Sequence, residues 1–487
     1  MNEIKFTSGD SFPMEMHKAK IVKKLELKPI DERLKCIQQA CNNTFLLHNS
    51  DIFLDMLTDS GTNAMSDKQQ SALLLADDTY AGSESFFKLQ KTCQELFGKK
   101  FLIPAHQGRA CENLLSRALV NKGDVTLMNY HFTTTKAHIL ENGGSVEELI
   151  IDEGLDNTSN FPFKGNMDID KLKSAIKRIG VNKIAFVRME AGTNLIGGQP
   201  FSLANLKEVS KVCRENGIKL ILDASLLTDN LYFIATREKP FNPVTKQKMT
   251  IEEITLEMSK LCDIVYFSAR KLGSARGGAI LLDDEKLNTQ LKELVTLFEG
   301  FITYGGMSIM EIEAINQGLK EAMDFFMINQ GPEFIKFLVD GLTANGVPMI
   351  TPSGGLGAHI DAKAFLSHIP QDQYPSGALC SALFIVGGIR AMERGTISEN
   401  RNEDGTDHFA KMELVRLACP RRVFTISHLK FVIDRVSWLY KNRNLIGGLK
   451  WVEEPKILRF FVGKLAPIGD WQEKLVAKFK ADFGESL

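Results

Sequence analysis

The sequence lacks the features of several classes of protein. No apolar run approaches the length of a membrane span, and the start, Met-Asn-Glu-Ile-Lys-Phe-Thr, has no signal-peptide core, so we expect a cytoplasmic protein without membrane contact. Lys plus Arg (59) nearly balances Asp plus Glu (60), and the net charge of −1 indicates no basic surface for nucleic acid. The 487 residues contain no internal repeat and no low-complexity segment.

Sequence patterns for a structural metal or a disulfide framework are also missing. The eight cysteines form no Cys-x-x-Cys pair, and the nine histidines show no spacing typical of metal ligands. Several cysteines lie in apolar stretches, where cysteine serves as a small core residue. The pattern therefore predicts reduced thiols in the cytosol and no structural zinc.

What the chain does have is an alternation of short apolar runs and helical patterns from about residue 95 to 282. The apolar runs are residues 100–104, 124–128, 183–187, 219–223, 264–268 and 278–282. The segments between them, such as 202–216, carry apolar residues at helical spacing and end in glycine. This alternation predicts βαβ units and an α/β fold with a mainly parallel sheet.

From about residue 320 the pattern changes to a long helix followed by shorter strands and helices. A chain of 487 residues is long enough for a large α/β domain and a smaller partner. We therefore expect a large domain over residues 56–320 and a smaller α+β domain formed by residues 1–55 and 321–487.

Ligands of parallel sheets bind outside the carboxyl ends of the strands, and Lys271 follows one such strand end. A lysine at the end of a buried strand is costly to desolvate unless it pairs or reacts. One such reaction is Schiff-base formation with pyridoxal phosphate, which needs a lysine that can lose its proton. The alternative is a solvated lysine with no chemical role.

Two further strand ends carry polar residues. In Pro-Ala-His-Gln-Gly-Arg (104–109) a strand ends and a helical pattern starts near Gly108, an arrangement that can hold a phosphate but that many α/β turns share. Asp223 is either a helix N-cap or the carboxylate that keeps a pyridine nitrogen protonated.

Three other positions have a chemical and a plain structural interpretation. Asn194 opens a glycine-rich turn that is either a loop or part of a site. Arg394 and Arg416 lie in apolar strands, where an arginine needs a planar anion. That anion is either a substrate carboxylate or an internal salt-bridge partner.

Read together, these stretches resemble the β-eliminating lyases, pyridoxal phosphate enzymes that include tyrosine phenol-lyase and tryptophanase. The matching stretches run nearly end to end: residues 31–35, 57–69, 80–83, 104–109, 132–135, 197–200, 304–306, 392–395, 420–423 and 458–461. The resemblance implies an aspartate-aminotransferase-like fold (fold type I), bound pyridoxal 5'-phosphate, and a homotetramer (a dimer of dimers) with active sites shared between subunits. It also implies β-elimination of an aromatic amino acid to pyruvate, ammonia and a leaving group.

Position by position, the resemblance implies roles for residues of the cofactor site. Lys271 would form the Schiff base and remove the α-proton of the substrate. Residues implied to bind the phosphate are Gln107, Gly108, Arg109 and Ser268. Residues implied to contact the ring are Phe132 by stacking, Asp223 at the pyridine nitrogen and Asn194 near the 3-oxygen.

The substrate site follows from the same resemblance. Arg416 would hold the amino acid carboxylate, and Tyr80, from the neighbouring subunit, would protonate the leaving group. The other implied substrate residues are Thr58, Ser60, Thr133, Phe301, Arg394, Phe460 and Phe461. Thr133, Arg394, Phe460 and Phe461 resemble the phenol-binding set of tyrosine phenol-lyases, where tryptophanase has aspartate in place of Thr133. Phe301 stands where the phenol-lyases have methionine.

The chain departs from the family near the lysine. Leu226 stands where the family has an arginine that contacts the 3-oxygen of the cofactor, and Arg270 is a candidate substitute. Gly61 and Asp78 match positions of a monovalent-cation (potassium) site, but the loop after Lys271 is shorter and lacks the family's asparagine. We therefore hypothesise that Arg276 places its guanidinium where potassium would lie.

Three interpretations remain open at this stage. The leading one is a tyrosine phenol-lyase-like enzyme. The second is β-elimination or β-replacement with another leaving group, from a substituted tyrosine or an S-substituted cysteine. The third is a non-catalytic scaffold protein, which the presence of Lys271, Asp223, Tyr80 and Arg416 disfavours.

Overall fold

The computed structural model describes residues 6–7, 12–402 and 404–487, and the chain divides into two compact units. The large unit comprises residues 59–329 and 354–356, and the small unit comprises residues 1–58, 330–353 and 357–487. The sequence analysis placed these boundaries after residues 55 and 320. Residues 1–5, which carry most of the segment read for a signal peptide, lie outside the described residues.

A seven-stranded sheet forms the centre of the large unit in the part of the chain that the structure describes. In spatial order the strands are β2 (Phe101–Ala105), β8 (Gly278–Leu282), β7 (Ile264–Ser268), β6 (Leu220–Asp223), β5 (Ile184–Glu190), β3 (Val125–Met128) and β4 (Ser145–Glu148). β7, β6, β5, β3 and β4 pair in parallel, whereas β8 is antiparallel to both of its neighbours, β2 and β7. The prediction of an α/β fold with a mainly parallel sheet is confirmed.

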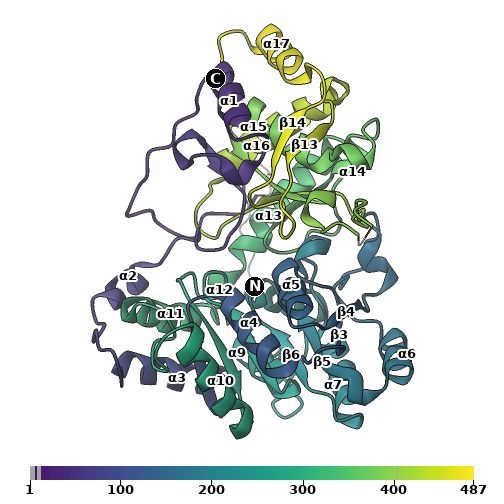
Figure 1. The fold of residues 1–487 in the computed structure, drawn as a ribbon. Helices are drawn as coiled ribbons and strands as arrows, with labels where there is room; N and C mark the ends of the chain where they lie inside the picture. The colour runs from purple at the N-terminus through teal and green to yellow at the C-terminus, as the bar shows by residue number, and fades with distance from the viewer. Residues whose placement is uncertain (1–5, 8–11, 403) are drawn as a thin grey trace. The chain divides into compact units, whose positions relative to one another are not determined.

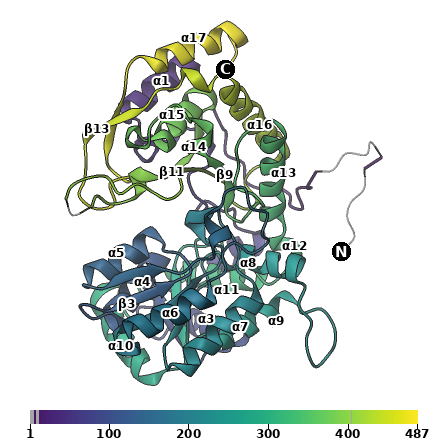
Figure 2. The ribbon, with the colours of Figure 1, turned by 90° about the vertical axis from the view of Figure 1, so that its right-hand side faces the viewer.

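Both faces of this sheet are buried under helices. Neighbouring residues of each strand point to opposite faces, so they belong to different apolar clusters. In β6, Ile221 belongs to one apolar cluster, whereas Leu220 and Leu222 belong to another. The helices of the large unit are α2 (Asp67–Leu73), α3 (Glu84–Phe97), α4 (Gly108–Leu119), α5 (Thr133–Glu141), α6 (Ile169–Ile179), α7 (Leu203–Glu215), α8 (Leu227–Phe233), α9 (Ile251–Leu261), α10 (Glu285–Phe298), α11 (Ile309–Glu321) and α12 (Phe325–Ile328). Figures 1 and 2 show α3 and α11 side by side, in agreement with their contacts.

Local sequence signals set several helix ends. The side chain of Ser202 accepts a hydrogen bond from the backbone N–H of Asn205 and starts α7, and Asn216 ends the helix. α4 starts at Gly108, as the sequence predicts, directly after β2. These helices run between strands, so the carboxyl ends of the parallel strands lie next to helix starts.

The small unit is built around a three-stranded antiparallel sheet in the order β11 (Met392–Arg394), β12 (Leu414–Ala418) and β9 (Gly357–Asp361). Two pairs accompany it: β1 (Leu54–Asp55) with β10 (Ile389–Arg390), and β13 (Leu449–Glu453) with β14 (Lys464–Pro467). Its helices are α1 (Ile30–Gln39), α13 (Gln330–Ala344), α14 (Ala362–Phe365), α15 (Pro375–Gly387), α16 (Ile426–Lys441) and α17 (Trp471–Phe483). The mixture of helices with an antiparallel sheet is an α+β arrangement.

α15 forms the centre of the small unit. Every residue of this helix is buried, which is typical of a helix that is apolar on all sides. α13 and α16 lie side by side, as Figure 2 shows. Among the described residues, no helix combines the length and the apolar character needed to cross a membrane.

Candidate active site

Lys271 lies in the loop between β7 and β8, in the large unit. Its backbone N–H donates to the carbonyl of Ser268 over 3.1 Å, and its side chain is half-buried. The Nζ atom lies 5.3 Å from the centroid of the Phe132 ring. Phe132 is the N-cap of α5, so the structure brings the predicted reactive lysine and the predicted stacking ring together.

The start of α4 meets the end of β7 at Gly108. A Cβ atom added to Gly108 would lie only 2.7 Å from the Cβ of Ser268, and thus glycine alone permits this approach. Gln107 is the N-cap of α4 and is half-buried, whereas Arg109 is exposed. Backbone N–H groups at this helix start therefore lie next to the Ser268 hydroxyl, an arrangement suited to a phosphate.

Asp223 ends β6 and is buried, with 4% of its surface exposed. Its Oδ2 accepts hydrogen bonds from Nη2 of Arg188 (2.5 Å) and from the hydroxyl of Tyr266 (2.8 Å). Burial acts to raise the pKa of Asp223, but the Arg188 guanidinium and the hydrogen bonds from Ser225 and Tyr266 hold it below its ordinary value. The side chain is therefore an ionised carboxylate at neutral pH.

The turn after β5 holds Asn194, which is buried and opens a short 3₁₀ helix, Asn194–Ile196. Its backbone N–H donates to Oε1 of Glu190 over 3.1 Å. Leu226 is also buried, at the N-cap of α8, and its Cβ lies 2.9 Å from the position of a Cβ added to Gly192. Leu226 therefore contributes an apolar surface where an arginine would contribute a charged donor.

Tyr80 and Phe301 contact each other in the large unit. Their ring centroids lie 5.6 Å apart, and Tyr304 lies at 5.5 Å from Tyr80 on an edge. A hydrogen bond with Tyr304 raises the pKa of Tyr80 above its ordinary value. With 71% of its surface exposed, Tyr80 can present its hydroxyl to a molecule outside this unit.

Gly61 lies against Arg270. The Nη1 atom of Arg270 is 3.1 Å from the position of a Cβ added to Gly61, and the Gly61 N–H donates to the Arg270 carbonyl over 3.4 Å. Arg276, in contrast, is exposed, and its backbone N–H donates to Glu311. Arg270 is therefore the cation found beside Gly61, and the role of Arg276 stays a prediction.

The surroundings of Gly61 carry a positive charge. The guanidinium of Arg270 would repel a cation at this distance. Asp78 is exposed, with a left-handed backbone conformation (φ 31°). Across the described residues, no group of three or more His, Cys, Asp or Glu side chains is placed to hold a metal ion.

In the small unit, Arg416 and Arg394 lie on one face of the three-stranded sheet. Arg416 pairs with Met392 on β11, and Arg394 lies two residues further along that strand on the same face. Both arginines are buried, and Nη2 of Arg416 donates to the carbonyl of Leu57 over 2.7 Å. The prediction that both lie in strands is confirmed by β11 and β12.

His359, which the sequence analysis did not single out, shares this face because it pairs with Arg416 across β9 and β12. Burial and the nearby Arg416 and Arg394 lower the pKa of His359 to about 3, so the imidazole is neutral. Nδ1 lies 3.0 Å from the Gly357 carbonyl, and Nε2 makes no hydrogen bond to any described residue. Nε2 of His359 is therefore a buried nitrogen that can accept a hydrogen bond.

Aromatic rings complete this part of the small unit. The guanidinium carbon of Arg394 lies 5.8 Å from the centroid of the Phe460 ring, and the ring centroids of Phe460 and Phe461 lie 4.1 Å apart. Phe45 packs edge-on against both rings. The structure thus places Arg394 against Phe460 and Phe460 against Phe461, and their role in binding a substrate ring stays a prediction.

The remaining predicted substrate residues lie near the unit boundary or at a helix start. Thr58 and Ser60 are half-buried; Thr58 belongs to the small unit and Ser60 to the large one. Thr133 opens α5 directly after Phe132, and its Oγ1 is buried without a hydrogen bond to any described residue. A buried hydroxyl without a partner is costly unless a ligand satisfies it.

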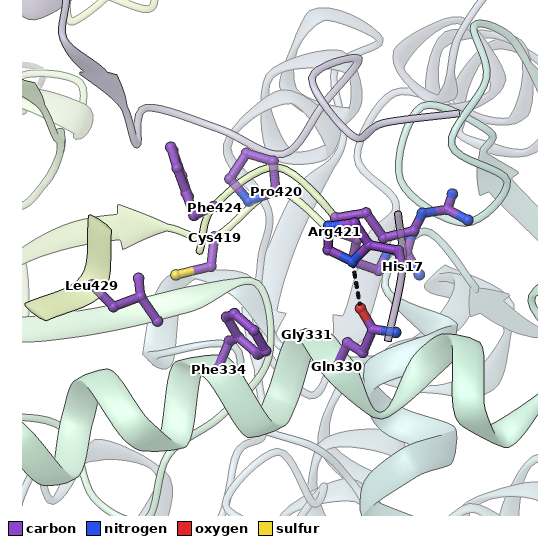
Figure 3. A pocket seen from close by; sticks show the side chains of 10 residues that line it. His17, Gln330, Gly331, Phe334, Cys419, Pro420, Arg421, Phe424 and Leu429 are labelled. Carbon is purple, nitrogen blue, oxygen red and sulfur yellow. Dashed lines mark hydrogen bonds between the residues drawn. The ribbon is translucent and has the colours of Figure 1, made fainter. Parts of the chain in front are cut away.

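A pocket in the small unit lies apart from all of these residues. Figure 3 shows it lined by Phe334, Cys419, Phe424 and Leu429, with Nδ1 of His17 3.2 Å from Oε1 of Gln330 at one side. No predicted site residue lines it, so it contributes nothing to the chemistry described above.

Comparison with known proteins identifies the family. The family model described as beta-eliminating lyase matches residues 55–435. The chain belongs to the β-eliminating lyase family. It is 42% identical over 459 residues to a tyrosine phenol-lyase from Pasteurella multocida, which covers 94% of this chain and 99% of the relative. It is also 42% identical over 456 residues to a tyrosine phenol-lyase from Symbiobacterium sp., over 93% of this chain and 98% of the relative.

Solved structures agree on the fold of this β-eliminating lyase. An aspartate aminotransferase from Thermotoga maritima matches with a TM-score of 0.58 at 14% identity, over 85% of this chain and 96% of that one. A serine palmitoyltransferase from S. paucimobilis matches with a TM-score of 0.55 at 12% identity, over 81% and 89%. The predicted aspartate-aminotransferase-like fold of type I is confirmed.

The residues of the large unit fit pyridoxal 5'-phosphate. Gly108 lets the start of α4 approach Ser268 closely, and Asp223 is a buried, ionised carboxylate at a strand end. Lys271 lies within reach of the face of Phe132. An anion cradle, a carboxylate for a ring nitrogen and an amine beside an aromatic ring are the groups that this cofactor requires.

Sequence reasoning missed Arg188, Tyr266 and Glu190, which surround Asp223. The signal was present in the apolar strand Ile-Ala-Phe-Val-Arg-Met-Glu (184–190), which carries an arginine and a glutamate. An arginine in an apolar strand needs an anion, and this holds for Arg188 as it does for Arg394 and Arg416.

Proposed function

We propose that this protein is a pyridoxal-phosphate-dependent enzyme that cleaves L-tyrosine, with uptake of one water molecule, to phenol, pyruvate and ammonia. The observation that carries the proposal is membership in the β-eliminating lyase family with 42% identity to tyrosine phenol-lyases over nearly their whole length. The residues of the candidate site supply the groups that this chemistry needs.

Pyridoxal 5'-phosphate, when bound, accepts the electron pair that the α-carbon of an amino acid leaves behind when it loses its proton. In this chain the groups proposed to hold the phosphate are Gln107, Gly108, Arg109 and Ser268. The groups proposed to hold the ring are Phe132, Asn194, Asp223 and Lys271.

Two side chains are proposed to move protons. Lys271 is half-buried beside Phe132, and its Nζ, in the uncharged form, would accept the α-proton of the substrate. The pKa of Tyr80 is raised above its ordinary value, which already lies well above neutral pH, so its hydroxyl holds a proton that it would donate to the leaving ring. The substrate would thus lose one proton and gain another at different atoms.

The small unit is proposed to orient the substrate. Arg416 is buried and its Nη2 donates to the Leu57 carbonyl, which holds the guanidinium in place, and a guanidinium suits a carboxylate. Arg394 against Phe460, with Phe461 beside it, would bind the aromatic ring and its hydroxyl. Thr58, Ser60 and Phe301 are proposed as further substrate contacts.

Thr133 favours phenol as the leaving group. Its buried Oγ1 has no hydrogen-bond partner among the described residues, and the hydroxyl of a tyrosine ring could satisfy it. A leaving group without a hydroxyl, such as a thiol from an S-substituted cysteine, would leave Oγ1 unsatisfied. Specificity of this kind depends on matching a buried polar group.

We further propose a homotetramer built as a dimer of dimers, a cytoplasmic location and a role in aromatic amino acid catabolism. The exposed ring of Tyr80 supports an active site completed by a second subunit. We propose that the enzyme needs no potassium, since the guanidinium of Arg270 already places a positive charge beside Gly61.

Pyruvate release from L-tyrosine, L-tryptophan and S-substituted cysteines, with phenol measured in parallel, tests the proposal. We expect pyruvate and phenol in equal amounts from L-tyrosine, and neither product from a Lys271→Ala variant. Pyruvate from a thiol-leaving substrate without phenol from tyrosine would instead favour the broader β-eliminating activity. A protein that binds no pyridoxal phosphate would favour a scaffold.

A further inference from the structure

Arg188 is fully buried in β5 and makes a set of polar contacts that the proposed reaction does not use directly. Nη2 donates to Oδ2 of Asp223 over 2.5 Å, and Nε donates to the hydroxyl of Tyr266 over 3.0 Å. Nη1 lies 3.3 Å from Oε2 of Glu190 and 3.5 Å from the backbone carbonyl of Tyr130. A guanidinium held on all three nitrogens cannot turn toward another partner.

Three neighbouring strands bring these side chains together. Glu190 of β5 pairs with Asp223 of β6, and Asp223 pairs with Tyr266 of β7. Arg188 lies two residues before Glu190, on the same face of β5. Because the cluster is part of the sheet, its geometry is set by the ladder hydrogen bonds and not by a mobile loop.

The two carboxylate oxygens of Asp223 accept hydrogen bonds from different donors. Oδ2 accepts from both Arg188 and Tyr266, whereas Oδ1 accepts the backbone N–H of Ser225 at 2.9 Å, and the Ser225 side chain also stabilises the carboxylate by a hydrogen bond. A carboxylate oxygen can accept a second hydrogen bond. Oδ1 is therefore the oxygen left to receive a proton-bearing ring nitrogen.

We propose that Arg188 is a positioning residue for the cofactor: together with Tyr266 it fixes Oδ2 of Asp223, presents Oδ1 to the pyridine nitrogen, and makes the carboxylate a weaker base toward that nitrogen. This inference rests on the proposed function, because it requires that pyridoxal phosphate binds at Asp223. It assigns to Arg188 control over how readily the ring nitrogen keeps its proton.

The charges around Arg188 support this assignment. An Asp223 carboxylate whose charge is already balanced by a guanidinium attracts a pyridinium proton less than an unpaired one does. Burial raises the pKa of Glu190 to about 7, although Arg188 opposes this, and burial also raises the pKa of Glu112 on α4. Below neutral pH, Asp223 is therefore the anion that carries most of the pairing with Arg188.

The remaining ionisable groups do not replace Arg188. Tyr266 is neutral, because burial raises its pKa well above the ordinary value. Lys271 lies close enough to Glu190 to favour its ionised form. Arg188 is thus the cation in direct hydrogen-bond contact with Asp223 among the described residues.

The ring nitrogen itself provides the test. Pyridoxal phosphate labelled with ¹⁵N in the ring is bound to the wild-type protein and to Arg188→Met, Arg188→Lys and Tyr266→Phe variants. The ¹⁵N chemical shift of the holoproteins is then followed against pH. We expect Arg188→Met to raise the titration midpoint of the ring nitrogen by about one pH unit or more, since Asp223 becomes a stronger base.

Two variants guard against a purely structural role for Arg188. Tyr266→Phe keeps the guanidinium but removes one donor to Oδ2, so we expect a smaller shift in the same direction. Arg188→Lys keeps the charge and should leave the midpoint closer to wild type than Arg188→Met does. Arg178→Met, which removes an exposed arginine paired with Glu147, is the matched control and should not change the midpoint.

The outcomes separate this inference from the proposed function. If all proteins bind the cofactor and the midpoints of Arg188→Met and Tyr266→Phe equal that of the wild type, Arg188 has no such role. If Arg188→Met does not fold, an unchanged midpoint in Tyr266→Phe overturns the inference on its own. If the wild-type protein binds no pyridoxal phosphate, the proposed function fails first and the inference fails with it.

Discussion

Gly108 at the start of α4 and Ser268 at the end of β7 approach so closely that a Cβ on Gly108 would lie 2.7 Å from the Cβ of Ser268. Helix and strand would have to separate to admit a methyl group, at the place where we propose a phosphate binds. Gly108→Ala should therefore weaken pyridoxal phosphate binding at least about tenfold and cost the apoprotein about 1–3 kcal/mol of unfolding free energy.

Cofactor titration followed by absorbance, and urea unfolding of the apoprotein, measure the two effects of Gly108→Ala. Gly273→Ala is the control, because a Cβ there would meet its nearest atom at 3.6 Å, an ordinary contact distance. Equal cofactor affinity in the Gly108→Ala and wild-type proteins would contradict the proposal that the phosphate binds at this helix start.

Tyr80 offers a test of proton donation without a change in stability. Its ring is 71% exposed, so loss of the hydroxyl removes no buried hydrogen bond. We expect Tyr80→Phe to lower kcat for L-tyrosine by about 10²–10⁴-fold, the range for loss of a general acid, with unchanged thermal unfolding and cofactor binding. Tyr304→Phe, which removes the hydroxyl that hydrogen-bonds with Tyr80 but leaves the Tyr80 hydroxyl in place, should have a much smaller effect, and similar losses in both variants would contradict the role of Tyr80.

Glu393 predicts a pH dependence of stability in the small unit. Burial, followed by the nearby Glu413 carboxylate, raises the pKa of Glu393 from 4.5 to about 8. The folded protein therefore keeps this proton at pH values where the unfolded chain has released it, so stability falls as pH rises from about 4.5 through about 8. The loss should be on the order of a few kcal/mol.

Denaturant unfolding at a series of pH values checks the Glu393 prediction. Glu393→Gln should flatten the decline, since an amide cannot ionise, whereas substitution of the exposed Glu485 should leave it intact. A decline of the same size in Glu393→Gln and wild type would assign the effect to other groups.

The contact between Arg270 and Gly61 predicts the response to salt. Activity on L-tyrosine in potassium and in sodium buffers of equal ionic strength should agree within about twofold, because the guanidinium repels a cation there. Arg270→Ala removes that charge and should make the rate dependent on potassium, whereas Arg276→Ala, at an exposed position, should behave as wild type. Several-fold activation of the wild type by potassium would contradict this.

Much of the large-unit fold follows from local sequence pattern. The apolar runs at 264–268 and 278–282 coincide with β7 and β8, and Ser202 starts α7 where the pattern indicates. The edge strand β4 was missed because Ser-Val-Glu-Glu is polar and partly exposed, so it lacks the apolar signal of a buried strand. The reversed direction of β8 was also missed, since strand direction depends on the connection and not on composition.

The residues of the candidate site also include some that the sequence could predict and some that it could not. Lys271, Asp223 and Gly108 follow strands that the pattern identifies, so their chemistry could be proposed from the sequence. Arg188 and Tyr266 could not be assigned, because their contact with Asp223 exists only after three strands align. Arg270, and not Arg276, lies beside Gly61 for a similar reason: residues more than two hundred positions apart meet only in the folded chain.

The loop that carries Lys271 is closed at both ends by β7 and β8, which run antiparallel and exchange ladder hydrogen bonds up to the Ser268–Gly278 pair. Within the loop, the Ala269 N–H donates to the Gly277 carbonyl over 2.9 Å. Nε2 of Gln69, from α2, donates to the Gly273 carbonyl over 2.7 Å and holds the loop from another element. Opening it fully therefore requires breaking the pairing of β7 with β8. The amide hydrogens of Ala269 and Gly273, which are hydrogen-bonded within this loop, should therefore exchange with solvent more slowly than amides of exposed loops.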